Sequence, residues 1–158
     1  QVAGPHAGWS VLQTPQRFIQ FSGWHHNYRE VWTDGRALPG IDEVEPTWNG
    51  YSVGRWEGNT FVVDSLGFDP RTWLDHNGYP HSDQMRLQER YRLVDADTLE
   101  LRMTITDPDF YAQPFQSDVK LFRRDRENEK AWDEQIYCVP SDEQRFNRLI
   151  RDGGVGKN

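Results

Sequence analysis

The feature that most constrains the fold of this chain is a pair of alternating segments, residues 85–94 and 98–107, on either side of a short polar turn. In the second segment every other residue from Leu99 to Ile105 is aliphatic or methionine, and the residues between them are polar or charged. Side chains along a strand point alternately to opposite faces of a sheet. The pattern therefore predicts a half-buried antiparallel hairpin that turns at residues 95–97.

Several further short segments have strand character and are separated by residues that favour turns, among them Asp34-Gly35 and Glu57-Gly58-Asn59. These segments are residues 18–21, 28–33, 51–56, 60–66, 115–122 and 132–137. Many short strands with turn signals between them are typical of a barrel or a sandwich. We expect an all-β fold, an antiparallel lipocalin-like meander barrel of about eight strands. A two-sheet sandwich is the alternative.

A helix is predicted near the C-terminus. Ser141 is a suitable N-cap with Gln144 three residues later, and the apolar residues that follow recur at helical spacing as far as Ile150. Gly153-Gly154 would end this helix. The chain has 158 residues, which predicts one domain over residues 1–158.

Composition excludes several classes of partner. The net charge is −7, from 18 basic and 25 acidic residues, which argues against nucleic acid as a partner. No apolar run approaches the roughly 20 residues of a membrane span. No dinucleotide-binding or P-loop motif occurs, so we expect no cofactor. The 7 Trp, 6 Tyr and 8 Phe suit the walls of a pocket for a small molecule, and a protein partner is a further possibility.

Glu89 is the most informative single residue. It alternates with Leu87, Tyr91 and Leu93 on one face of the predicted strand, while arginines occupy the other face. If the apolar residues face the interior, Glu89 does so too. A carboxylate inside a protein must be paired, hydrogen-bonded or neutral, and each state suits a catalyst or a polar ligand site. The structural alternatives are an interior ion pair with an arginine of a neighbouring strand, or a bulge that turns Glu89 outward.

The irregular stretch 67–84 precedes this strand and carries Asp75, His76, His81 and Ser82. Loops of more than about 12–15 residues are commonly functional. An imidazole at the rim and a deeper carboxylate form a common pair for acid–base chemistry, so we pair His81 with Glu89. The alternative is a loop held by local hydrogen bonds, with His76 exposed.

A metal site is not expected. His25-His26 would have to combine with His81 and Asp75 or Asp83 from separate loops, and no HxH, HxxxH or HExxH spacing occurs. The single cysteine, Cys138, allows no internal disulfide. Adjacent residues cannot form a hydrolase triad, which excludes one built from residues 81–83.

Four blocks of the sequence, REVWTDGRALP, GYSVGRWEGNTFVVDSLGF, RTWLDHNGYPHSDQMRLQERYRLVDADTLELRMTITDP and CVPSDEQRFN, resemble a family of exported β-barrel proteins from soil and environmental bacteria. The similarity extends from about Phe18 to Arg151. It implies a location in the periplasm or outside the cell, and it carries no reaction. The matching blocks include most of the stretch 67–84 and the predicted strand that carries Glu89.

These observations lead to three hypotheses for function. The first is a small-molecule-binding β-barrel with an aromatic-lined pocket and His and carboxylate polar groups. The second is an acid–base enzyme, a lyase, isomerase or hydrolase, that uses the same cavity. The third is an accessory subunit of an exported complex. The candidate catalytic residues are His81, Glu89 and Asp75, and the candidate ligand-binding residues are Trp73, Trp56, Tyr91, Ser82 and Arg90.

Overall fold

The computed structural model describes residues 9–22, 27–75 and 77–126. The chain divides into two compact units, Gln1–Arg124 and Asp125–Asn158, and the β-sheet belongs to the first. The predicted strand at 132–137, the predicted C-terminal helix and Cys138 lie outside the described residues. The expectation of a single domain stays a prediction.

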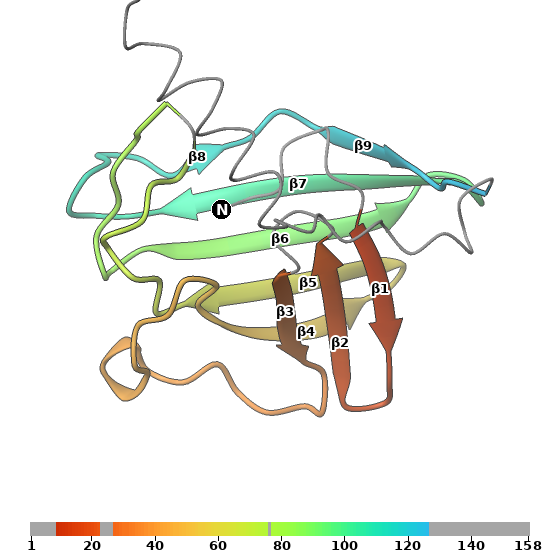
Figure 1. The fold of residues 1–158 in the computed structure, drawn as a ribbon, viewed down its shortest axis with the longest axis horizontal. Coiled ribbons are helices and arrows are strands. Elements are labelled where there is room, and N and C mark those ends of the chain that lie inside the picture. The colour runs from red at the N-terminus through yellow and green to blue at the C-terminus, as the bar shows by residue number, and fades with distance from the viewer. Residues whose placement is uncertain (1–8, 23–26, 76, 127–158) are drawn as a thin grey trace, which may run out of the picture. The chain divides into compact units, whose positions relative to one another are not determined.

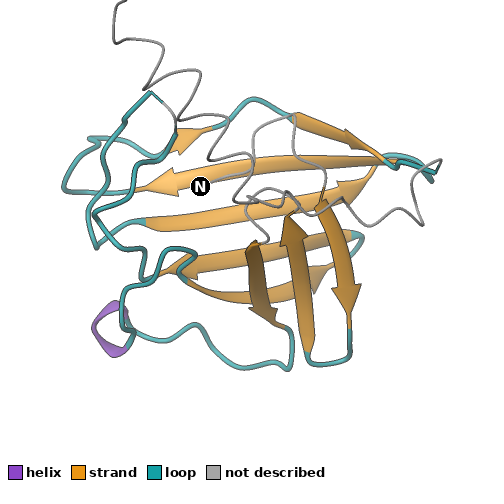
Figure 2. Ribbon diagram, viewed as in Figure 1, coloured by secondary structure: helices purple, strands orange, loops and turns teal. Residues whose placement is uncertain are grey.

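The described residues of the first unit form a single β-sheet of nine strands, drawn as arrows in Figure 2. The strands are β1 (Trp9–Gln13), β2 (Arg17–Ser22), β3 (Asn27–Trp32), β4 (Tyr51–Glu57), β5 (Thr60–Leu66), β6 (Arg86–Leu93), β7 (Thr98–Thr106), β8 (Phe115–Gln116) and β9 (Lys120–Arg123). Their order in the sheet is β1 to β8 in sequence, and β9 pairs with β7. The predicted hairpins at 51–66 and 85–107 are confirmed.

One joint departs from the expected antiparallel meander. β3 and β4 are parallel and meet at a single pair, Trp32 and Val53. Parallel neighbours cannot be joined by a tight turn, so a long connection is needed. Residues 33–50 provide it, with one short 3-10 helix, η2 (Ile41–Glu43). The remaining strand pairs are antiparallel.

The sheet curls into a half-barrel. In Figure 1, β1 to β3 run steeply across β4 to β6. The Trp9 ring on β1 lies 6.4 Å from the Tyr91 ring on β6 and 5.4 Å from the Phe122 ring on β9, measured between centroids. In the described residues β1 pairs only with β2, so these side-chain contacts, and no backbone ladder, link the two ends of the sheet.

The apolar core occupies the concave face of this curl. Phe61 of β5 packs against Phe18 of β2 with ring centroids 5.0 Å apart. Gly54 of β4 makes this packing possible, because a Cβ at that position would lie 2.5 Å from the Phe61 ring and 2.9 Å from Val31. The buried core residues are Val31, Phe61, Val63, Phe68, Met85, Leu87, Tyr91, Leu101 and Met103.

The prediction of one continuous strand at 115–122 is wrong. This segment is divided into β8 and β9, which pair with different halves of β7. Ser117 interrupts the ladder, since its hydroxyl accepts a hydrogen bond from the Met103 amide and donates one to the Asp118 carbonyl. The strand β1 was not predicted, because Val11 and Leu12 are exposed and leave no apolar alternation to detect.

Candidate functional site

Glu89 lies inside the half-barrel, as its alternation predicts. The residue is 3% exposed. The Tyr91 hydroxyl donates a 2.8 Å hydrogen bond to Oε1, and Nη2 of Arg29 lies 2.6 Å from Oε2. The second of these contacts is the interior ion pair that was one of the structural alternatives. The pairing of β6 with β5 and β7 is regular through this position, so no bulge turns Glu89 outward.

Arg29 is held by two serines as well as by Glu89. Its Nε and Nη2 donate to Ser52 Oγ at 3.2 and 3.1 Å, and Nη2 also donates to Ser65 Oγ at 2.7 Å. The two hydroxyls are hydrogen-bonded to each other at 2.9 Å. We call Arg29, Ser52, Ser65, Glu89 and Tyr91 the interior polar cluster. It joins β3 to β4, β5 and β6.

Strand register explains how these residues meet. Ser52 and Ser65 are direct partners across the β4–β5 ladder. Glu89 is the partner of Val63, two residues along β5 from Ser65 and on the same face. Arg29 shares a face of β3 with Val31, a core residue, so its side chain points into the curl. The Arg29 side chain keeps 17% exposure and that of Glu89 keeps 4%, which places the arginine nearer to solvent.

The cluster changes the proton affinities of its members. Burial raises the pKa of the Tyr91 hydroxyl well above its ordinary value, and the negative charge of Glu89 adds to this effect. Burial alone would lower the pKa of Arg29, but the adjacent Glu89 carboxylate outweighs it, so the pKa of Arg29 is raised. Arg29 is therefore positive, and Tyr91 is a neutral hydrogen-bond donor at physiological pH.

His81 is also buried, at 3% exposure, but it belongs to a different network. Its Nδ1 lies 2.9 Å from the Ser82 carbonyl oxygen, so this nitrogen must carry a hydrogen and donate it. Its Nε2 lies 2.8 Å from Thr72 Oγ1, which also lies 2.9 Å from the Asp69 carbonyl oxygen. These bonds hold the stretch 67–84 together.

Hydrogen bonds between Ser82 and Asp107 also hold the stretch 67–84 in place. The Ser82 hydroxyl donates to Oδ1 of Asp107 at 2.7 Å, and the Ser82 amide donates to Oδ2 at 2.6 Å. Asp107 is 1% exposed and directly follows β7. Burial would raise the pKa of Asp107, but the hydrogen bonds from Ser82 lower it overall. The carboxylate thus ties the loop to the end of the sheet.

His81 and Glu89 belong to separate hydrogen-bond networks. Within the part of the chain that is described, His81 bonds to Thr72 and Ser82, whereas Glu89 contacts Tyr91 and Arg29, and the two networks share no member. Asp75 lies elsewhere in the loop, where its carboxylate accepts hydrogen bonds from the Asn77 amide and side chain. The acid–base pairing of His81, Glu89 and Asp75 stays a prediction.

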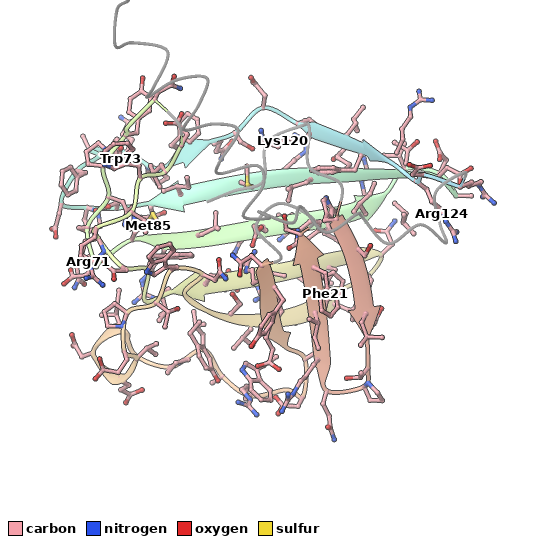
Figure 3. All side chains as sticks on the ribbon, in the orientation of Figure 1. Phe21, Arg71, Trp73, Met85, Lys120 and Arg124 are labelled. Carbon is pink, nitrogen blue, oxygen red and sulfur yellow. The ribbon has the colours of Figure 1, made fainter. Side chains whose placement is uncertain are left out.

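The candidate ligand-binding residues are scattered. Trp73 is 65% exposed, on the loop at the end of the sheet where Figure 3 labels it. Trp56 is 59% exposed, but its ring lies 5.1 Å from the Phe61 ring, at the margin of the core. Arg90 is on the opposite face of β6 from Glu89, where its Nη2 contacts Glu57 at 2.9 Å. Of these candidates only Tyr91 belongs to the interior polar cluster.

Metal and membrane features add nothing to the site. No group of three or more His, Cys, Asp or Glu side chains in the described residues is arranged to hold a metal ion. His25, His26 and His76 fall outside those residues. In the described ranges no helix has the length and apolar character needed to cross a bilayer.

Three members of the cluster, Arg29, Ser52 and Ser65, were not identified from the sequence. A signal for Arg29 existed, because it alternates with Val31 on one face of its strand in the same way as Glu89 alternates with Leu87. The two serines had no such signal, since a small polar residue in a strand fits either face.

Comparison with known proteins finds no matching family model, no matching curated protein and no matching solved structure.

Proposed function

We propose that this protein binds a small, partly apolar molecule on the concave face of its half-barrel, with the interior polar cluster as the polar contact. Lipocalin-like barrels use the corresponding interior to hold one small ligand. The observation that supports this proposal most strongly is that polar groups from four strands lie together in an interior that is otherwise apolar. Ligand sites commonly combine apolar walls with a few placed polar groups.

Fold stability alone does not require such a cluster. Transferring two charges out of water is costly, and well-packed apolar residues in place of a buried ion pair are often as stable or more so. The cluster lies between β3 and the strands β4, β5 and β6. Apolar side chains could occupy the same space. A function that needs polar groups at this place accounts for the cost.

Aromatic side chains adjoin the cluster and would provide the apolar part of the site. Tyr91 is a member, its ring is 6.4 Å from that of Phe61, and Trp9 approaches it edge-on at the same centroid distance. Aromatic faces and edges suit a planar or ring-containing ligand. The expected ligand is therefore a small molecule with one ring and one polar group.

Binding is better supported than acid–base catalysis. The catalytic hypothesis needs His81 and Glu89 to act on one substrate, and the two side chains are held by separate hydrogen-bond networks. A role as an accessory subunit remains a proposal that stands on the aromatic content of the chain, and export to the periplasm or beyond remains a proposal that stands on the sequence resemblance.

Backbone amide NMR shifts provide the test. The labelled protein would be titrated with benzamide, benzyl alcohol, benzoate and benzylamine, which share a ring and differ in their polar group. We expect at least one compound to shift amides of β3 to β6 around the cluster. The replacement Ser65→Ala should weaken this response, and Arg102→Met on the outer face should not. Shifts confined to the loops, or no shifts with all four compounds, would reject the proposal.

A further inference from the structure

We infer that the interior polar cluster selects a neutral ligand carrying a hydrogen-bond donor beside an acceptor, such as a carboxamide or a hydroxyl, over a carboxylate or an amine. This inference rests on the proposed binding function and adds the chemical class of the ligand. It is based on the hydrogen bonds within the cluster and on the donor and acceptor positions that these bonds leave unused.

The two serines leave one donor over. Each hydroxyl has a single hydrogen. The bond between Ser52 and Ser65 uses one of the two hydrogens, whichever residue donates. Both oxygens also accept hydrogen bonds from Arg29, which uses none of their hydrogens. One hydroxyl hydrogen is therefore without an acceptor among the residues that the structure describes.

Glu89 leaves one acceptor over. Oε1 accepts the hydrogen bond from Tyr91. Oε2 lies 2.6 Å from Arg29 Nη2 as an ion pair and is covered from solvent. A carboxylate oxygen can accept two hydrogen bonds, and no second donor contacts Oε2 in the described part of the chain. A ligand that donates to this oxygen would use that second position.

The spare donor and the spare acceptor are close to each other. Nη2 of Arg29 contacts both Ser65 Oγ, at 2.7 Å, and Glu89 Oε2, at 2.6 Å. A ligand would approach from the Arg29 side, which is the more exposed, and its donor would replace part of the Arg29 contact with Oε2. A carboxamide or a hydroxyl can donate to Glu89 and accept from a serine with one group.

Charge separates this class of ligand from ionised ones. The positive charge of Arg29 is already matched by the negative charge of Glu89, so the cluster is neutral as it stands. A carboxylate or an ammonium group would bring an uncompensated charge into a largely desolvated place, which is costly. A carboxylate also has no hydrogen to donate to Oε2.

Isothermal titration calorimetry at neutral pH with the same four compounds tests the inference. Benzamide or benzyl alcohol should bind at least about tenfold more tightly than benzoate and benzylamine, a difference of about 1.4 kcal/mol. The replacement Glu89→Gln leaves Arg29 positive and unmatched, so it should raise the affinity for benzoate and lower that for benzamide. Glu100→Gln, on the outer face of β7, is the matched control and should keep the wild-type order.

A second variant keeps the test valid if Glu89→Gln does not fold. The double replacement Ser52→Ala with Ser65→Ala removes both hydroxyl hydrogens without changing charge, and should weaken benzamide binding several-fold while leaving benzoate unaffected. Tighter binding of benzoate than of benzamide to the wild-type protein, or an affinity of this double variant for benzamide equal to that of wild type, would overturn the selectivity and leave the binding function standing. The absence of binding by all four compounds would overturn both.

Discussion

The replacement Glu89→Gln tests the energetic role of the interior ion pair. It keeps the size of the side chain and the acceptor for Tyr91, but it removes the charge opposite Arg29. Breaking a buried ion pair by removing one partner costs about 3–5 kcal/mol. Because the Arg29 side chain keeps 17% exposure, water can solvate part of its charge, and we expect the lower end, about 3 kcal/mol.

Urea unfolding followed by tryptophan fluorescence measures this loss. At roughly 2–4 °C per kcal/mol for a chain of this length, Glu89→Gln should also lower the melting temperature by about 6–12 °C. The double replacement Arg29→Leu with Glu89→Leu removes both charges, so it should cost less than Glu89→Gln alone. Glu100→Gln on the outer face should change stability little.

A loss below about 1 kcal/mol for Glu89→Gln would refute this reasoning, because such a value is typical of an exposed pair. A double replacement as unstable as the sum of its single replacements would refute it too, since the two charges would then be uncoupled. Either result would mean that Glu89 faces water in solution.

Three further predictions concern the rest of the fold. Gly54→Ala should lose about 1–3 kcal/mol in urea unfolding, since its new methyl group would overlap two core side chains, whereas Gly40→Ala meets only ordinary contacts and should lose little. Hydrogen bonds from the Arg71 guanidinium lower the pKa of Asp69 to about 2. The stabilising contribution of Asp69 is therefore complete above about pH 4 and is lost as the pH falls towards 2, so Asp69→Asn should flatten the acid-unfolding curve in that window. An unchanged curve would contradict this. Ser82→Ala should cost about 1–3 kcal/mol, because it leaves Oδ1 of the buried Asp107 without a strong partner, and hydrogen exchange should accelerate across residues 69–85.

Local patterns in the sequence were sufficient to predict the hairpins and the burial of Glu89. Alternation along residues 85–93 fixes which side chains share a face, and no bulge disturbs it. The partner of Glu89 could not be identified in this way. Arg29 reaches Glu89 only because β3 crosses over the later strands after a parallel joint with β4, a long-range arrangement with no local signature.

The pairing of His81 with Glu89 rests on their separation in the sequence. A buried histidine needs hydrogen-bond partners, and a loop rich in polar groups offers them close by. Thr72 and the Ser82 carbonyl satisfy both ring nitrogens. His81 and Glu89 have different hydrogen-bond partners in the described residues, and their pairing in one site stays a prediction.

Nitrogen-15 NMR of the arginine side chains shows whether Arg29 is held in the interior polar cluster. If the Arg29 guanidinium is held by Glu89, Ser52 and Ser65, its N–H resonances should be sharp and exchange slowly with water in the wild-type protein, and they should exchange faster in the Glu89→Gln protein. The exposed Arg86 serves as the internal reference. Arg29 resonances that exchange as rapidly as those of Arg86, and that do not respond to the loss of the Glu89 charge, would contradict the existence of the interior polar cluster.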